Sequence, residues 1–171
     1  MKNVKVEIGK TVKVAEQEFI VLNILENGVL CLSKDFAYEN TEFDNNSNNY
    51  ANSSIRKTLN TKYLKKITDV IGEENIIESE IDLMSDDGLD DYGKVTDKVG
   101  LLSADMYRKY NRIIERYPVN DWWWLSTPFS TEHRGYNYSV RCVDDLGTLS
   151  HYYCYYLNGV RPFLIFSASI F

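Results

Sequence analysis

The first third of the chain alternates hydrophobic and polar positions in the way that antiparallel strands do. Residues 11–14 alternate strictly, and residues 18–24 carry a run of apolar side chains. Asn27-Gly28 has the composition of a two-residue type I′ turn, and residues 29–32 are apolar again. The pattern therefore predicts a β-hairpin over residues 18–32.

Helical spacing replaces this alternation in the middle of the chain. Ser54 is the predicted N-cap of a helix over residues 55–59, because a serine side chain accepts hydrogen bonds from free backbone N–H groups. Residues 61–71 repeat apolar side chains at helical spacing, so we expect a second helical piece there. A break or bend is expected between the two pieces, at Asn60-Thr61.

Two short strands and another helix follow. Residues 76–84 alternate like a strand, and residues 99–102 form a short apolar run typical of a buried strand. Ser103 is placed to cap a helix over residues 104–111, with Asp105 favourable in its first turn.

Two polar stretches separate these elements. Residues 38–53 are rich in Asn, Ser, Glu and Asp, which favours a long solvated loop over a binding loop. Residues 85–91 are acidic, but their spacing does not fit the alternating ligands of a calcium-binding EF-hand loop. A solvated turn is therefore the preferred interpretation of this second stretch.

The last third returns to the strand pattern. Residues 136–143 and 148–156 flank the turn at residues 144–147, and Asn158-Gly159 is a second hairpin signal before residues 160–166. Strands, then short helices, then strands indicate an α+β fold. We expect one domain with antiparallel strands and short helices over residues 1–171.

Composition and charge exclude some classes of protein. Of 171 residues, 44% are hydrophobic and 26% charged, which is normal for a folded globular domain. Nineteen basic against 25 acidic residues give a net charge of -6, which disfavours duplex-DNA binding. The chain carries neither a secretory h-region nor an apolar run near the ~20 residues of a membrane helix. We expect no membrane insertion and a cytoplasmic location at synthesis.

The residues that usually carry catalysis form no recognisable pattern. The three cysteines lack CxxC spacing, so reduced apolar thiols are favoured over a zinc site or a Cys142–Cys154 disulfide. His151 could pair with Cys142 or Cys154, yet no local signature supports such a dyad. GxGxxG, GxxxxGK[ST] and HExxH are absent, and carboxylates are too common to indicate glycoside chemistry. We predict a non-enzymatic protein with no catalytic residue, cofactor or metal.

A tyrosine-rich stretch at residues 135–159 is the strongest functional signal. Tyrosine combines a large, stiff contact area with a polar hydroxyl, which is why binding surfaces favour it. Strand alternation would place Tyr152 and Tyr156 on one face with Cys154, and His151, Tyr153 and Tyr155 on the other, so that one face belongs to the core. We predict a ligand-binding surface formed by Tyr136, Tyr138, His151, Tyr152, Tyr153, Tyr155 and Tyr156.

Several motifs, in a fixed order, resemble a bacterial and phage family of domains of unassigned function. Its members carry WxVL…LLIS, SxLRxWLN, DKVFLLS, WWLRSP and GVRPAL. The matching segments here are residues 19–22 with 30–33, 52–60, 97–103, 123–128 and 159–164. Ser126 stands in place of the usual Arg and Phe163 in place of the usual Ala, which bears on any role of that Arg.

This resemblance implies a C-type-lectin-like scaffold. Trp123, Trp124, Arg161 and Pro162 would form its core and frame, with one of the two successive tryptophans nearer the surface. The variable stretch between the last two motifs would be the binding face. A phage protein that enters a virion or is released by lysis would fit the same expectations about location.

These observations lead to one principal hypothesis and two alternatives. The principal one is a recognition domain, of a phage, prophage or bacterial accessory protein, that binds a protein or glycan surface through its tyrosines. The first alternative is an intracellular anti-defence inhibitor whose acidic surface blocks a basic nucleic-acid-binding partner. The second, implied by the resemblance, is a lectin-fold enzyme of the formylglycine-generating type, which needs a reactive cysteine pair.

Overall fold

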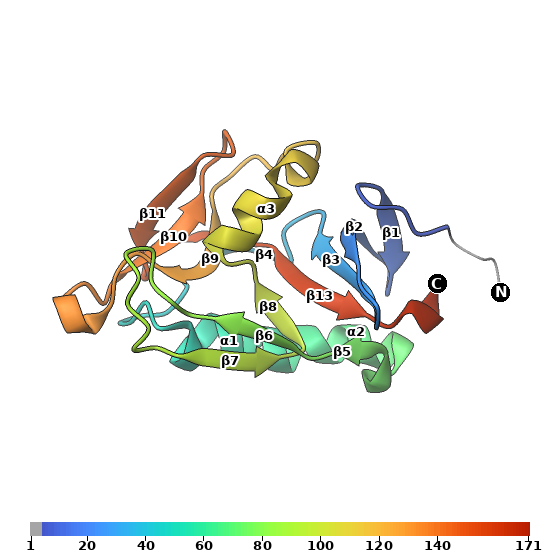
Figure 1. Cartoon of the computed structure of the whole chain (residues 1–171), viewed down its shortest axis with the longest axis horizontal. Helices are drawn as coiled ribbons and strands as arrows, with labels where there is room; N and C mark the ends of the chain where they lie inside the picture. The colour runs from blue at the N-terminus through green and yellow to red at the C-terminus, as the bar shows by residue number, and fades with distance from the viewer. Residues whose placement is uncertain (1–4) are drawn as a thin grey trace.

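The computed structural model describes residues 5–171 as an α+β domain with two main sheets and a separate two-stranded ribbon (Figure 1). The six-stranded sheet contains β1 (Thr11–Val14), β2 (Gln17–Ile24), β3 (Val29–Ser33), β13 (Pro162–Phe166), β5 (Ile76–Ile77) and β8 (Val99–Leu101). The five-stranded sheet has the order β11 (Leu149–Tyr153), β10 (Ser139–Val143), β9 (Trp123–Pro128), β12 (Asn158–Val160) and β4 (Tyr38–Thr41). The ribbon pairs β6 (Ser79–Asp82) with β7 (Lys94–Asp97).

Two helical segments accompany the sheets. The first runs without interruption through α1 (Ser54–Thr58), the π-helical turn η2 (Leu59–Tyr63) and α2 (Leu64–Ile71); the second is α3 (Ala104–Ile114). Four 3-10 turns complete the described elements: η1 (Tyr50–Asn52), η3 (Glu73–Asn75), η4 (Glu132–Arg134) and η5 (Ala168–Ile170). In Figure 1, α1 and α2 lie along one side with the ribbon, and α3 lies on the opposite side.

The strand pairings are antiparallel, as predicted, except that β12 runs parallel to β9 through Gly159 and Trp123. Strands β3 and β13 are buried along their whole length, which explains their continuous apolar runs. None of the helices described for residues 5–171 combines the length and apolarity that a bilayer crossing requires.

The β2–β3 hairpin is confirmed, with Ile24 opposite Val29, but the predicted turn type is wrong. Neither Asn27 nor Gly28 has the positive φ that a type I′ turn requires. Residues 25–28 instead form a wider loop, closed by a 2.7 Å bond from Leu25 N–H to the Gly28 carbonyl. The tight left-handed turn lies between β1 and β2, at Ala15-Glu16 with φ of 47° and 63°.

The predicted helices are present, but the positions of one cap and one helix end differ from the prediction. Ser103 caps α3 by accepting from Met106 N–H at 3.1 Å, and that helix extends to Ile114, beyond the predicted end at residue 111. The first helix is capped by Ser53 rather than Ser54, since Ser53 Oγ accepts from Arg56 N–H at 3.2 Å. The predicted break at Asn60-Thr61 is absent because the chain continues there as a π-helical turn.

Three loop and strand predictions are corrected by pairing and burial. Residues 38–53 are no solvated loop: they contain β4 and η1, and Phe43 and Asn48 within them are fully buried. The stretch 76–84 divides into β5 and β6, which join different sheets. Asn158-Gly159 lies inside β12, where Gly159 packs against the Phe36 ring and leaves no room for a side chain.

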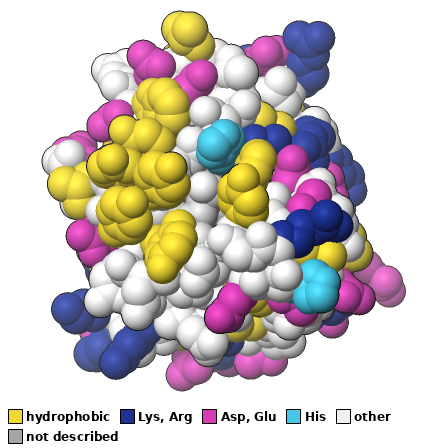
Figure 2. Space-filling model, turned by 90° about the vertical axis from the view of Figure 1, so that its left-hand side faces the viewer, with side chains coloured by type: hydrophobic (Ala, Val, Ile, Leu, Met, Phe, Trp, Pro, Cys, Tyr) yellow, Lys and Arg dark blue, Asp and Glu magenta, His cyan; other side chains and the backbone are white. Residues whose placement is uncertain are grey.

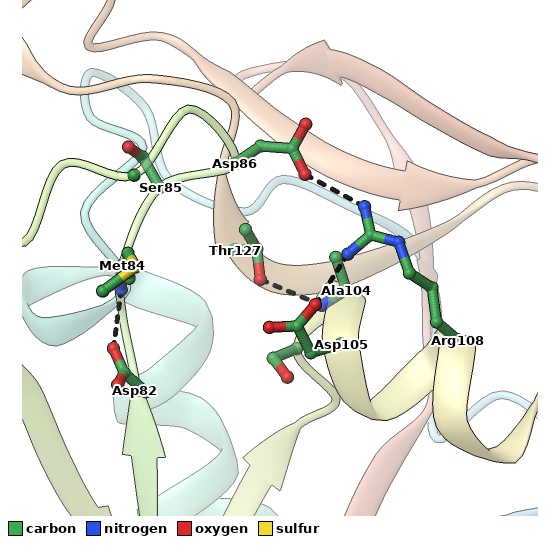
Figure 3. A pocket seen from close by; sticks show the side chains of 10 residues that line it. Asp82, Met84, Ser85, Asp86, Ala104, Asp105, Arg108 and Thr127 are labelled. Carbon is green, nitrogen blue, oxygen red and sulfur yellow. Dashed lines mark hydrogen bonds and ion pairs between the residues drawn. The ribbon is translucent and has the colours of Figure 1, made fainter.

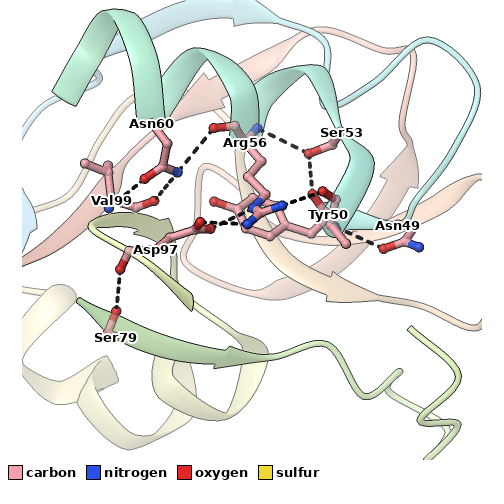
Figure 4. Close-up of polar contacts among 9 residues, drawn as sticks. Asn49, Tyr50, Ser53, Arg56, Asn60, Ser79, Asp97 and Val99 are labelled. Atoms are coloured by element: carbon pink, nitrogen blue, oxygen red, sulfur yellow. Dashed lines mark hydrogen bonds and ion pairs between the residues drawn. The ribbon is translucent and has the colours of Figure 1, made fainter. Parts of the chain in front are cut away.

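Several residues of the sequence motifs hydrogen-bond to one another or to the backbone (Figure 4), and we call the set Arg56, Asn60, Asp97 and Arg161 the frame. Arg56 holds Asp97 through two bonds, Nε to Oδ2 at 2.9 Å and Nη2 to Oδ1 at 2.8 Å. Asn60 pairs with the backbone of Val99 as a strand would, giving its amide to the carbonyl at 2.8 Å and accepting from the N–H at 3.2 Å. The helix is thereby fixed against β7 and β8.

Arg161 joins the two main sheets at the start of β13. It is 1% exposed and donates from Nε to the Ser33 carbonyl at 3.2 Å and from Nη2 to the Lys34 carbonyl at 2.9 Å. Its guanidinium lies 5.0 Å from the Trp123 ring centroid, and burial lowers its pKa to about 10. Both Trp123 and Trp124 are buried, so the expectation that one of them approaches the surface is wrong.

Candidate binding surface

All seven residues predicted to bind a ligand are exposed. They lie at the end of the five-stranded sheet where β10 and β11 are located, on a face that carries many hydrophobic side chains (Figure 2). The six tyrosines are between 38% and 57% exposed. They come from the loop before β10, from β11, and from the turn that follows β11. We call this set the tyrosine surface: Tyr136, Tyr138, His151, Tyr152, Tyr153, Tyr155 and Tyr156.

The aromatic rings of this surface form two clusters. Four tyrosines at residues 152–156 contact one another, with ring centroids 4.5 Å apart for Tyr152–Tyr156 and 5.6 Å apart for the nearly parallel pair Tyr153–Tyr155. Trp122 extends this first cluster, at 5.3 Å from Tyr152. These rings support one another and present a continuous aromatic area.

The second cluster surrounds Phe129. His151 lies 4.4 Å and Tyr136 6.4 Å from the Phe129 ring centroid, and the Arg141 guanidinium lies 5.5 Å from it. Sequence reasoning did not select Phe129 or Arg141, although both connect predicted site residues. Tyr138 is exposed and has no ring contact of this kind within residues 5–171.

The strand predicted for residues 148–156 is shorter than expected, although consecutive side chains of β11 do alternate between its two faces. Strand β11 ends at Tyr153, whose carbonyl accepts from Tyr156 N–H at 2.9 Å to close a tight turn. Cys154 turns inward and is buried, and its N–H donates to the Tyr138 carbonyl at 2.7 Å. Consecutive residues 151–153 are all exposed, because β11 is an edge strand and neither of its faces is covered there.

The tyrosine hydroxyls are free to bind. Within residues 5–171, none of the six makes a hydrogen bond to another group of the protein. The pKa of Tyr155 is raised, first by desolvation and then by the neighbouring tyrosines, so its hydroxyl remains a neutral donor at physiological pH. A ligand would therefore meet apolar ring area and polar hydroxyl tips together.

Asn48 positions the segment that carries Tyr136 and Tyr138, and sequence reasoning missed it. It is fully buried, and its amide nitrogen donates to the carbonyls of Ser130, Tyr136 and Ser139 at 2.8 to 2.9 Å. Its side-chain oxygen accepts from the Tyr92 hydroxyl at 2.8 Å. One asparagine in an Asn-rich stretch has no local signal that distinguishes such a buried role.

The acidic stretch 85–91 holds the same surface from the other side. Asp86 accepts from Arg141 Nη2 at 2.9 Å and from Arg108 Nη2 at 3.2 Å. Asp87 accepts from the Ser130 hydroxyl at 2.8 Å, and Asp91 from the Thr131 hydroxyl at 2.8 Å. These carboxylates are neither a simple solvated turn nor free for a cation: they anchor the residues that flank Phe129.

A pocket of about 300 Å³ lies beside this stretch, at the start of α3 (Figure 3). Its charged groups are already paired, since Arg108 bonds both Asp86 and Asp105. The first N–H of α3, on Ala104, donates to Thr127 Oγ1 at 2.9 Å. The pocket is therefore lined by polar groups that are bonded within the chain, including the Ser85 hydroxyl, which donates to the Asp87 carboxylate.

The cysteines are poorly suited to nucleophilic chemistry. All three are free and buried, and burial raises the pKa values of Cys31 and Cys142 to about 12 and of Cys154 to about 11. Cys142 pairs with Ser150 in the sheet, so its side chain projects to the face opposite His151. Within residues 5–171, no group of three or more His, Cys, Asp or Glu side chains is placed to hold a metal ion.

The fold and the exposed aromatic residues define an α+β domain with a tyrosine surface at one end of its smaller sheet. The chain belongs to the family described as "Domain of unknown function (DUF6273)", whose model matches residues 26–168. The matched region contains the whole tyrosine surface and every motif segment except residues 19–22. No curated protein and no solved structure gives a significant match to the chain.

Proposed function

We propose that this protein is a non-catalytic recognition domain that binds a protein or glycan surface through its tyrosine surface. One observation carries the proposal: six half-exposed tyrosines from three segments gather at one end of the molecule, and their hydroxyls make no hydrogen bond within residues 5–171. Tyrosine-rich surfaces of this kind combine adaptable hydrogen bonds with contact area at low entropic cost.

The proposal includes a C-type-lectin-like arrangement, in which a fixed frame presents a variable binding face. The bonded motif pairs Arg56–Asp97 and Asn60–Val99 support the idea of a fixed frame. The stretch between the last two motifs supplies the exposed tyrosines, which supports the idea of a variable face. A phage, prophage or bacterial accessory protein is the setting we propose.

The alternative of an acidic inhibitor receives less support. In the acidic stretch 85–91, Asp86, Asp87 and Asp91 already accept bonds from side chains of the same chain, so a basic partner would have to meet exposed carboxylates elsewhere, such as Glu39 and Glu42. Steep weakening of binding with added salt would favour this alternative, because screening acts on charge-led association. Binding through tyrosines is expected to depend only weakly on salt.

Affinity capture from bacterial lysate and cell-envelope extract tests the proposal. The wild type is compared with a variant that combines Tyr152→Ala, Tyr155→Ala and Tyr156→Ala, which removes most of the first aromatic cluster. We expect a partner that the wild type retains and the variant loses. Because these rings are only about half exposed and contact one another, the unfolding temperature of the variant is measured first, and capture is carried out well below it.

A matched control removes exposed apolar side chains elsewhere. The variant with Ile8→Ala, Ile24→Ala and Val70→Ala deletes side chains that are 50% to 66% exposed and lie outside the tyrosine surface. It should keep the partner. Equal retention by all three proteins would assign the tyrosines to the scaffold and refute the proposal.

A further inference from the structure

The outer edge of β11 carries backbone groups that have no hydrogen-bond partner among residues 5–171. Along the β10–β11 ladder, Asp144 N–H bonds the Thr148 carbonyl and Cys154 N–H bonds the Tyr138 carbonyl. Antiparallel ladders alternate, so residues 148, 150, 152 and 154 direct their backbone groups toward β10. The N–H and C=O groups of Leu149 and His151, and the N–H of Tyr153, therefore point outward from the sheet.

This edge lacks the features that normally block strand pairing. Charged side chains on an edge strand discourage another chain from adding to it. Four other edge strands have them: Lys13 on β1, Glu39 on β4, Glu80 on β6 and Lys94 on β7. The remaining edge strands, β5 and β8, have no charged residue, but they are two and three residues long and mostly buried. Strand β11 has none, and residues 146–159 contain no Lys, Arg, Asp or Glu at all.

Aromatic rings border both faces of the same edge. His151 and Phe129 lie on one face, and Tyr152 and Trp122 on the other, because consecutive strand residues alternate between faces. A strand added beside β11 would direct successive side chains over these two pairs of rings. The backbone would supply affinity and the rings would select the side chains.

We propose that the β11 edge binds an extended peptide segment of a partner protein by strand addition. The segment has uncharged, partly apolar residues opposite β11, to match the uncharged stretch 146–159. This inference rests on the proposed recognition function and narrows its ligand to a polypeptide, in preference to a glycan. The free backbone groups carry this choice, since a strand satisfies them at alternate residues.

The first experiment selects binders from a random library of linear peptides displayed against the full chain. The best binder is then resynthesised with one backbone N-methyl group at each position in turn. Methylation should weaken binding at every second residue, by about tenfold or more where an N–H faces β11. A library that yields no binder, or a scan without two-residue periodicity, would overturn the inference.

Two variants of the protein test the edge directly. His151→Pro removes an N–H that faces away from β10, so the hairpin keeps its ladder. His151→Ala removes the imidazole and keeps the N–H, and the ratio of the two Kd values isolates the backbone bond. We expect His151→Pro to bind about tenfold more weakly than His151→Ala. Equal Kd values would contradict strand addition, and the N-methyl scan decides the question if the proline variant fails to fold.

Two other results separate this inference from the proposed function. A captured partner that is lost by the tyrosine variant but held normally by His151→Pro would keep the recognition function and refute strand addition. Dimers of the wild type that disappear in His151→Pro, detected by analytical ultracentrifugation, would show that a second copy occupies the edge. That outcome would also overturn the peptide proposal.

Discussion

The frame and the tyrosine surface use polar side chains in opposite ways. In the frame, Arg56, Asp97 and Arg161 hydrogen-bond to other groups of the chain. On the tyrosine surface, rings and hydroxyls face outward, and the hydroxyls pair with nothing in the described residues. The polar groups of the frame are thus satisfied within the chain, whereas those of the tyrosine surface are available to another molecule, as the proposed function requires.

The two halves of the tyrosine surface also differ in how they are held in place. Asn48 and the acidic stretch 85–91 hold the Phe129 cluster by hydrogen bonds from behind, whereas the tyrosines at residues 152–156 are held mainly by contact with one another. Substitutions in the frame should therefore lower the unfolding free energy more than substitutions in the acidic stretch, and this order can be measured.

Arg161→Ala should have the largest effect on stability. The change removes the donors to two buried carbonyls and leaves a cavity beside Trp123, for a loss of about 3 kcal/mol or more in unfolding free energy. Urea denaturation followed by tryptophan fluorescence measures it. Arg112→Ala, at a side chain that is 91% exposed, is the control and should change stability by less than about 0.5 kcal/mol. Similar values for the two variants would remove Arg161 from the frame.

Asp97→Ala should have the next largest effect. It leaves the Arg56 guanidinium without its two-bond partner, in a site where the Asp97 side chain is only 6% exposed. We expect a loss of about 2 kcal/mol, and a double-mutant cycle with Arg56→Ala should return most of that as coupling energy. The matched control is Asp69→Ala at the exposed Lys65–Asp69 pair, where less than about 0.5 kcal/mol is expected. If the coupling energy of Arg56–Asp97 is no greater than that of Lys65–Asp69, the Arg56–Asp97 pair does not stabilise the frame.

Sequence reasoning found the elements whose signals are local. The Ser103 cap and the apolar runs of β2, β3 and β13 depend on neighbouring residues, and the structure has them where they were expected. The strand β7 was missed because its alternating residues, Lys-Val-Thr-Asp, are mostly polar on a two-stranded ribbon that buries little. The hairpin turn predicted at Asn158-Gly159 was wrong, because a glycine required by close packing cannot be distinguished in the sequence from a glycine required by a turn.

The sequence selected the exposed tyrosines that the structure brings together, but it did not select the residues that hold them in place. The exposed tyrosines could be selected because seven aromatic or imidazole side chains within one short region is an unusual density. Asn48, Phe129 and Arg141 could not be selected, because their importance comes from folded contacts. Asn48 bonds residues 44 to 91 positions away, and the Arg141–Asp86 pair spans 55 positions. Such contacts depend on the folded topology, and nothing in the local sequence indicates them.

The smallest effect concerns the anchoring of the tyrosine surface by Asp87. Hydrogen bonds from Ser85 and Ser130, together with the Arg134 charge, hold the pKa of Asp87 below its ordinary value of 3.8. Because the folded pKa is lowered, this contribution to stability is complete above the unfolded pKa, about 4. It is lost as the pH falls through the folded value. Since the Asp87 side chain is 38% exposed, the contribution should be less than about 1 kcal/mol.

Asp87→Asn isolates this contribution, because the amide has no charge to lose. The difference in unfolding free energy between wild type and variant should be constant from neutral pH to about pH 5 and shrink below about pH 4. Asp145→Asn, at an exposed carboxylate without a hydrogen bond or ion pair in residues 5–171, is the control. NMR signals of Phe129 and Tyr136 should move with the same titration, since Asp87 holds Ser130 beside them. A pH-independent difference, or rings that do not respond, would mean that the acidic stretch is not what orders the Phe129 end of the tyrosine surface.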